Sequence, residues 1–175
     1  MTFAGAISAP IKGNFTMQRN ANMLKILKKS AFLQILLVSL QKSLFSNGDA
    51  HLKNFSLQET DGGDYVLTPA YDLMNTSIHV NDGDFALQDG LIPESEYSDV
   101  YSRTLHPCKD DFITFGTRIG VLPKKLYSIV ELFATEQPRV YELIENSFLE
   151  EKVKRMYKQS YQERLRRFQR SDKID

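Results

Sequence analysis

The stretch that decides the fold is Asn47-Gly48-Asp49-Ala50-His51-Leu52-Lys53-Asn54, followed further along by Ala70-Tyr71-Asp72-Leu73. Within it, Asp49 and Asn54 have the spacing D-x-x-x-x-N. A carboxylate and an amide at this spacing can both point from one loop into one cleft. There the carboxylate can accept a proton and the amide oxygen can bind a metal ion. The spacing alone occurs by chance in many sequences, so the residues around it decide its meaning.

The segments around Asp49 form an ordered series. Residues 21–45 carry apolar side chains near helical spacing, which predicts a helix buried on more than one side. Ser46-Asn47-Gly48 would end that helix in a left-handed cap. Residues 55–67 hold two short β-like runs around a turn-rich centre, which predicts a β-hairpin that ends shortly before Asp72. Protein kinases have the same order of helix, catalytic loop, hairpin and second metal-binding Asp.

The rest of the sequence predicts a helical body. Residues 78–86 indicate a further extended pair, whose turn Asn81-Asp82-Gly83-Asp84 is expected to be solvated. His106-Pro107-Cys108 is expected to be a loop and not a metal site. Helices are expected over residues 110–120, from Pro123, from Pro138, and from about residue 150 to 169. The predicted fold class is α+β and mostly helical, with a small β-hairpin next to the loop that holds Asp49.

The composition indicates an ordinary single domain without a strong net electrostatic field. The 175 residues include 22 Lys plus Arg and 22 Asp plus Glu, which gives no argument for direct nucleic-acid or membrane binding. The single cysteine, Cys108, cannot form an internal disulfide, so a cytoplasmic location is expected. The most apolar window, residues 31–45, is shorter than the roughly 20 residues that a membrane helix needs. No secretory signal is visible at the start of the sequence.

Residues 47–57 and 67–73 resemble the C-terminal lobe of the HipA family, which are Ser/Thr protein kinases of bacterial type II toxin–antitoxin systems. The resemblance is close over residues 47–75 and looser as far as residue 167. It implies a protein-kinase-like C-lobe. Since residues 1–20 also show no clear period, we expect a division into three parts. These are a poorly specified lead-in over residues 1–20, a HipA-like C-terminal kinase lobe over residues 21–170 and a tail over residues 171–175.

The same resemblance implies a role for each residue of the motif. Asp49 falls on the catalytic Asp of the family, and Asn54 and Asp72 fall on its magnesium ligands. Lys53 is expected to act in catalysis, because a cation there would offset negative charge on the transferring phosphoryl group. His51 is grouped with the cofactor-binding residues, mainly as a hydrogen-bonding residue that sets the loop. The implied cofactors are ATP and Mg²⁺.

The implied function is transfer of the γ-phosphoryl group of ATP to a protein hydroxyl in a toxin–antitoxin context. The resemblance implies a protein substrate such as an aminoacyl-tRNA synthetase, glutamyl-type in the best-known members. It also implies a helix-turn-helix antitoxin partner (HipB-like), through which any contact with DNA would be indirect. No membrane partner is expected.

The sequence departs from the family pattern at its N-terminal end. A complete kinase holds the nucleotide with a Gly-rich loop and a strand Lys, whereas only 48 residues precede Asp49 and residues 1–30 show no strand–Gly-loop–strand pattern. We therefore expect a C-lobe without its N-lobe. Two interpretations stay open. The chain is a kinase lobe that acts with a separate N-lobe subunit, or it is a catalytically inactive truncated remnant that binds an antitoxin or another partner.

Overall fold

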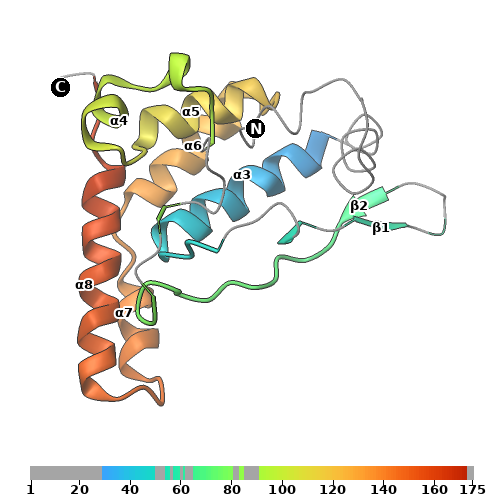
Figure 1. The fold of residues 1–175 in the computed structure, drawn as a ribbon. Coiled ribbons are helices and arrows are strands. Elements are labelled where there is room, and N and C mark those ends of the chain that lie inside the picture. The colour runs from blue at the N-terminus through green and yellow to red at the C-terminus, as the bar shows by residue number, and fades with distance from the viewer. Residues whose placement is uncertain are drawn as a thin grey trace.

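A computed structural model describes residues 29–49, 54–55, 57–59, 61, 65–80, 83–84 and 91–172. In these ranges the chain is mostly helical and has one antiparallel hairpin (Figure 1). The expected α+β, mostly helical fold is confirmed at this level. The elements in chain order are α3 (Lys29–Leu44), β1 (Leu57–Glu59), β2 (Tyr65–Leu67), η2 (Glu94–Glu96), α4 (Asp99–Thr104), α5 (Lys109–Arg118), α6 (Pro123–Ala134), α7 (Pro138–Glu145) and α8 (Glu151–Phe168).

Helix α3 lies at the centre of the fold and contacts α5, α6, α8 and β2 (Figure 1). Leu36 and Leu40 are fully buried, and Val38 and Lys42 are also buried although they project from other sides of the helix. The helix is therefore buried on more than one side, as its apolar pattern predicted. Its predicted extent over residues 21–45 is confirmed from residue 29 onward, and residues 21–28 lie outside the described residues.

The end of α3 is a left-handed cap, and the residue that adopts it is Ser46, with a φ of 54°. The Asn47 N–H donates to the Lys42 carbonyl at 2.9 Å, and the Ser46 N–H donates to the Ser43 carbonyl at 3.3 Å. This pair of bonds is the Schellman arrangement, which satisfies carbonyls that the helix end leaves unpaired. The cap turns the chain sharply and directs Asn47 and Gly48 toward the segment that follows β2.

The hairpin predicted over residues 55–67 is confirmed. Strands β1 and β2 pair antiparallel, with Leu57 opposite Leu67 and Glu59 opposite Tyr65. The extended pair predicted over residues 78–86 is wrong in its first part. The N–H groups of His79 and Val80 both donate to the Thr76 carbonyl, at 2.9 and 3.0 Å, so these residues form a turn and not a strand. Residues 81–82 and 85–86 lie outside the described residues.

The helical body follows the helix signals of the sequence. Pro123 and Pro138 occupy the first turns of α6 and α7, where a missing N–H costs nothing. Gly120 follows α5 with a φ of 84°, a conformation in which glycine carries no steric penalty. The helices expected over residues 110–120 and 150–169 are α5 and α8, each within two residues of the predicted ends. Helix α4 and the 3-10 turn η2 were not predicted.

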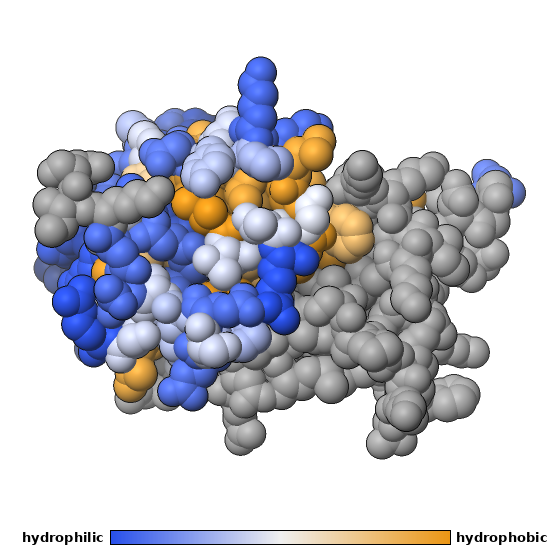
Figure 2. Space-filling model, turned by 90° about the horizontal axis from the view of Figure 1, so that it is seen from above, coloured by the Kyte–Doolittle hydropathy of each residue, from blue (hydrophilic) through white to orange (hydrophobic). Residues whose placement is uncertain are grey.

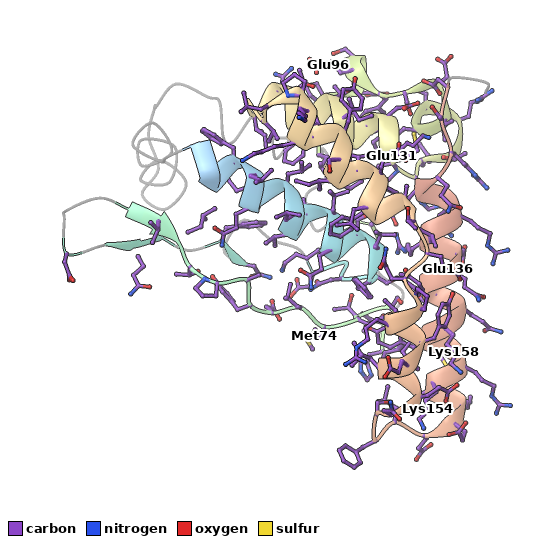
Figure 3. The ribbon with its side chains drawn as sticks, turned by 180° about the vertical axis from the view of Figure 1, so that it is seen from behind. Met74, Glu96, Glu131, Glu136, Lys154 and Lys158 are labelled. Atoms are coloured by element: carbon purple, nitrogen blue, oxygen red, sulfur yellow. The ribbon has the colours of Figure 1, made fainter. Side chains whose placement is uncertain are left out.

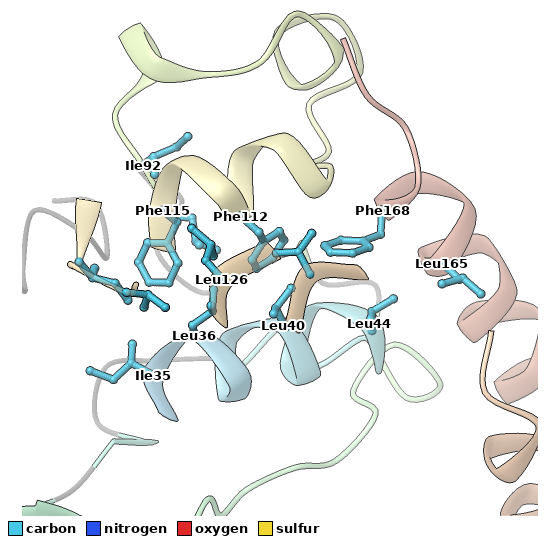
Figure 4. Packing of buried hydrophobic residues seen from close by; sticks show 14 of the residues in the cluster. Ile35, Leu36, Leu40, Leu44, Ile92, Phe112, Phe115, Leu126, Leu165 and Phe168 are labelled. Carbon is cyan, nitrogen blue, oxygen red and sulfur yellow. The ribbon is translucent and has the colours of Figure 1, made fainter. Parts of the chain in front are cut away.

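One apolar core joins these elements (Figure 4). Residues of α3, α5, α6 and α8 meet in it, and Phe112 of α5 stands edge-on to Phe168 of α8 with ring centroids 5.4 Å apart. Seen from above, an apolar area is exposed near the middle of that face, with hydrophilic residues to its left and below it (Figure 2). Among the described residues, no helix is both long and apolar enough to cross a membrane.

The last described residues return to the body. The Asp172 carboxylate accepts the N–H groups of Asp99 and Val100, at 2.8 and 2.9 Å, and so caps the N-terminus of α4. A negative charge is favourable at this end of a helix. The Ser171 hydroxyl donates to the Asp110 carboxylate at 2.7 Å. Residues 171–172, which the sequence assigned to a tail, thus fasten α8 to α4 and α5.

Candidate active site

Asn54 and Asp72 meet beside the C-terminal part of α3. The Nδ2 group of Asn54 donates to Oδ2 of Asp72 at 2.6 Å, although the two residues are 18 positions apart. Asn54 is buried, whereas Asp72 is exposed and has a left-handed φ of 55°. The hairpin brings the chain back to this point, so the buried amide fixes one side of the pair and the carboxylate faces solvent.

Asp49 lies beside this pair. It is exposed in the turn that follows the cap of α3, and its carbonyl accepts a second hydrogen bond from Asn54 Nδ2 at 3.2 Å. Three of the five residues singled out by the sequence, Asp49, Asn54 and Asp72, are therefore brought together. His51 and Lys53 lie outside the described residues, so their expected roles remain predictions.

The segment that carries Asp72 runs alongside α3 and is bonded to it at three levels. Gln34 Nε2 donates to the Thr68 carbonyl at 2.9 Å, and Lys42 Nζ donates to the Asp72 carbonyl at 3.2 Å. Beyond the end of the helix, the N–H of Thr76 donates to the Ser46 carbonyl at 3.0 Å. Each bond joins a part of α3 or its cap to a residue about thirty positions later, so the position of Asp72 is set by α3.

The loop before Asp49 is held by the same segment. The Gly48 N–H donates to Thr76 Oγ1 at 2.8 Å, and that hydroxyl in turn donates to the Ser46 carbonyl at 3.1 Å. The Ser46 hydroxyl also lies 2.7 Å from the hydroxyl of Ser160 on α8. Helix α8 thereby supports the turn from which Asp49 projects.

Two buried polar residues beneath the pair were not singled out by the sequence. Lys42 is 1% exposed and Asn47 is 2% exposed, and both donate to the main-chain oxygen of Asp72. Burial lowers the pKa of Lys42, and the nearby carboxylates of Asp72 and Asp49 oppose that effect. The only sequence signal for Lys42 was a charged residue inside an otherwise apolar helix, a pattern that does not reveal what the charge faces.

The carboxylate and amide of the pair fit a magnesium ion. Mg²⁺ binds oxygens at about 2.0–2.1 Å in an octahedron, so that neighbouring ligand oxygens lie roughly 2.9 Å apart. The 2.6 Å between Asn54 Nδ2 and Asp72 Oδ2 is close to that spacing. A half-turn of the amide would replace Nδ2 by the carbonyl oxygen and present two oxygens to one ion. Within the described ranges there is no cluster of three or more His, Cys, Asp or Glu side chains that could hold a metal by themselves.

The other motifs of the sequence have structural roles. Asp84 is not solvated as expected, because its side chain is 10% exposed and pairs with Arg164 and with His106 Nδ1, the latter at 2.7 Å. His106-Pro107-Cys108 is a loop, as predicted. Cys108 is the N-cap of α5, and its N–H donates to the Asp111 carboxylate at 2.8 Å.

Fold and site together define a class: a mostly helical α+β domain with a carboxylate–amide pair at the end of its central helix. The family model for the HipA-like C-terminal domain matches residues 2–141, and the chain belongs to this family. The matched part ends within α7, so α8 lies beyond it. No curated protein matches the chain at a significant level. The family expected from residues 47–75 is thus confirmed, while the predicted domain limits remain a prediction.

Proposed function

We propose that the chain is the catalytic and metal-binding part of a HipA-like Ser/Thr protein kinase. It would transfer the γ-phosphoryl group of ATP to a hydroxyl of a protein substrate. The observation that carries this proposal is the contact between Asn54 and Asp72 beside the exposed Asp49. Family membership supports it. The spacing of Asp49 and Asn54 and the later position of Asp72 also match the order in which kinases carry their base and their metal ligands.

Asp49 is the proposed base. Its exposed position allows a substrate hydroxyl to approach, and its backbone is fixed through the hydrogen bond from Asn54 to its carbonyl. A carboxylate placed within hydrogen-bond reach of the hydroxyl can orient it and accept its proton as the new bond to phosphorus forms. The proton moves to Asp49, and the leaving group is ADP.

Asn54 and Asp72 are the proposed ligands of the magnesium ion that accompanies ATP. When bound, Mg²⁺ would neutralise charge on the phosphate oxygens and orient them for transfer. Lys53, one residue before Asn54, would add a positive charge near the transferring group. Kinases also need a glycine-rich loop and a lysine that hold the phosphates. In this proposal those groups come from outside the described residues or from a partner subunit.

The proposed partners follow from the family. A helix-turn-helix antitoxin would bind the protein and mediate any contact with DNA. A glutamyl-type aminoacyl-tRNA synthetase is the first substrate to test. The alternative function is that of a partner-binding module without catalysis.

The test compares Mg²⁺-dependent ATP binding and substrate phosphorylation in three variants of the full chain. We expect Asp49→Asn to bind Mg-ATP like wild type but to lose phosphoryl transfer by roughly 100- to 10,000-fold. Asp72→Asn should lose Mg²⁺-dependent ATP binding. Asp61→Asn is the matched control, since Asp61 is exposed in the hairpin turn away from the pair, and it should behave like wild type.

Equal phosphorylation by wild type and Asp49→Asn would overturn the catalytic assignment. Absence of Mg²⁺-dependent ATP binding in wild type, both alone and with the antitoxin or N-lobe subunit added, would favour the partner-binding module instead.

A further inference from the structure

We propose that Lys42 is a positioning residue for the metal-binding carboxylate. From inside α3 it holds the main-chain oxygen of Asp72 together with Asn47, and so sets the direction in which the Asp72 carboxylate faces Asn54. This inference rests on the proposed function, in which Asp72 binds the metal ion that accompanies ATP.

The geometry places two donors on one oxygen. The Asp72 carbonyl accepts a hydrogen bond from Asn47 Nδ2 at 2.6 Å and another from Lys42 Nζ at 3.2 Å. The first donor comes from the cap of α3 and the second from its last turns. Two donors on one carbonyl restrict the rotation of the peptide group that follows Asp72, and they so hold the backbone from which the Asp72 side chain leaves.

Three unfavourable features occur together at this contact. The Lys42 ammonium is buried, which costs free energy unless hydrogen bonds and opposite charge compensate. Asn47 Oδ1 is buried and, within the described residues, has no hydrogen-bond partner. Asp72 has a left-handed φ of 55°, which side-chain-bearing residues rarely adopt. Such costs concentrate at sites where a side chain has to be held in one direction.

The charge of Lys42 also suits the site. The carboxylates of Asp72 and Asp49 both act electrostatically on its ammonium group. Two carboxylates close to each other repel, and a buried cation beneath them offsets that repulsion. A neutral residue in this place would retain the packing of α3 but lose both the donor to Asp72 and the compensating charge.

The surroundings leave room for a test by substitution. A pocket of about 200 Å³ borders both Lys42 and Asn47, and Phe45, Leu73 and Tyr157 form part of its wall. Methionine has nearly the length of lysine and can pack against Phe45 and Leu73 in this wall. Lys42→Met therefore removes the donor and the charge with little change in volume.

The experiment measures the affinity of Mn²⁺ with ATP by electron paramagnetic resonance, which does not depend on phosphoryl transfer. We expect Lys42→Met to weaken Mn²⁺ binding by about 10- to 100-fold, the range for outer-shell partners of metal ligands. Asn47→Ala removes the other donor to the same oxygen and should weaken Mn²⁺ binding in the same way. It therefore tests the positioning role even if Lys42→Met does not fold. Lys42→Arg, which retains a cationic donor, should recover part of the affinity.

Lys154→Met is the matched control. Lys154 Nζ also donates to a main-chain oxygen, that of Glu145 at 3.0 Å, but it does so near the turn between α7 and α8 (Figure 3). The Lys154→Met variant should bind Mn²⁺ with the affinity of wild type. If Lys42→Met and Asn47→Ala bind Mn²⁺ like wild type while Asp72→Asn does not, the positioning role is overturned and the proposed function stands. If wild type binds no Mn²⁺ with ATP, either alone or with the antitoxin or N-lobe subunit added, the proposed function fails, and the positioning role fails with it.

Discussion

At the scale of the residue, Asn54 is the side chain on which the site depends most. Its Nδ2 group donates both to the Asp72 carboxylate and to the Asp49 carbonyl, so one buried amide links the proposed base to the proposed metal ligand. The amide is neutral, and its two hydrogens serve these contacts before any ion binds. Replacing it by a carboxylate would remove both donors and place two negative charges side by side.

We therefore predict that Asn54→Asp makes the stability of the protein depend on divalent cations. Without metal, the loss of two hydrogen bonds and the new repulsion should lower the free energy of unfolding by roughly 1–3 kcal/mol. Mg²⁺ should restore most of this loss, because it would bind between the two carboxylates. Thermal melting in EDTA and in Mg²⁺ measures the effect. Asn146→Asp adds the same charge at an exposed position after α7, and its melting temperature should not respond to Mg²⁺.

The sequence predicted some residues of the candidate site and not others. Asp49, Asn54 and Asp72 could be found because the spacing and the order of helix, loop and hairpin lie within one stretch of chain. Lys42 and Asn47 could not, because their partner is the main-chain oxygen of Asp72, 30 and 25 positions away. Every residue has a main-chain oxygen, so the type of residue 72 does not show that its carbonyl accepts these bonds.

At the scale of the element, α5 and α6 approach closely at Gly116. A Cβ atom on Gly116 would lie 2.4 Å from Cδ1 of Leu126, which is 1% exposed and cannot move aside into solvent. Glycine inside a helix is otherwise unfavourable by about 1 kcal/mol relative to alanine. The sequence shows a glycine in a helix, but only the packing of α6 explains it.

We predict that the effect of Gly116→Ala on the free energy of unfolding has opposite signs in wild type and in a Leu126→Ala variant. In wild type, Gly116→Ala should lower the free energy of unfolding, since overpacking costs about 1–3 kcal/mol and exceeds the gain in helix propensity. In a Leu126→Ala background the same substitution should raise it. Urea denaturation of the four proteins measures both effects. Gly120→Ala is the control, because Gly120 has a φ of 84° and open space around it, so its cost should be the same in either background.

Helix boundaries were predictable where one residue determines them, as at Pro123, Pro138 and Gly120. The extended pair over residues 78–86 was wrong because the N–H groups of His79 and Val80 are taken by the Thr76 carbonyl. Helix α4 was missed because it has only six residues, although Ser98 is a local N-cap whose hydroxyl accepts the Tyr101 N–H. The second cap, from the Asp172 carboxylate after α8, lies too far along the chain for a local pattern to show it.

At the scale of the whole molecule, α8 closes the fold. Tyr161, Leu165 and Phe168 are buried in the common core, and the residues after α8 cap α4. The thiol of Cys108 lies in this region and is fully buried, and burial raises its pKa to about 11. Because folding raises the pKa of this thiol, the folded protein loses stability as the pH rises. The loss falls between the usual thiol pKa of 9.0 and about 11. At pH 8 the folded thiol should therefore react only when the structure opens.

We predict that Leu165→Ala destabilises the whole fold by about 2–5 kcal/mol and accelerates alkylation of Cys108 at pH 8 accordingly. A factor of ten in rate corresponds to about 1.4 kcal/mol when reclosing is faster than the reaction. Leu143→Ala on α7 is the control, because Leu143 is 58% exposed and its removal should change the rate little. A similar rate for Leu165→Ala and wild type would mean that α8 does not belong to the cooperative unit around Cys108.

The burial of Cys108 has a practical consequence for fluorescence measurements on the protein. Since it is the only cysteine in the sequence and its sulfur is covered in the folded state, the natural chain is already a suitable background for site-specific dye attachment. A cysteine introduced in place of the exposed Asp61 would take a fluorophore at neutral pH, while the native thiol stayed unlabelled. Its emission would then report, in real time and on single molecules, how the hairpin responds when nucleotide or a partner arrives.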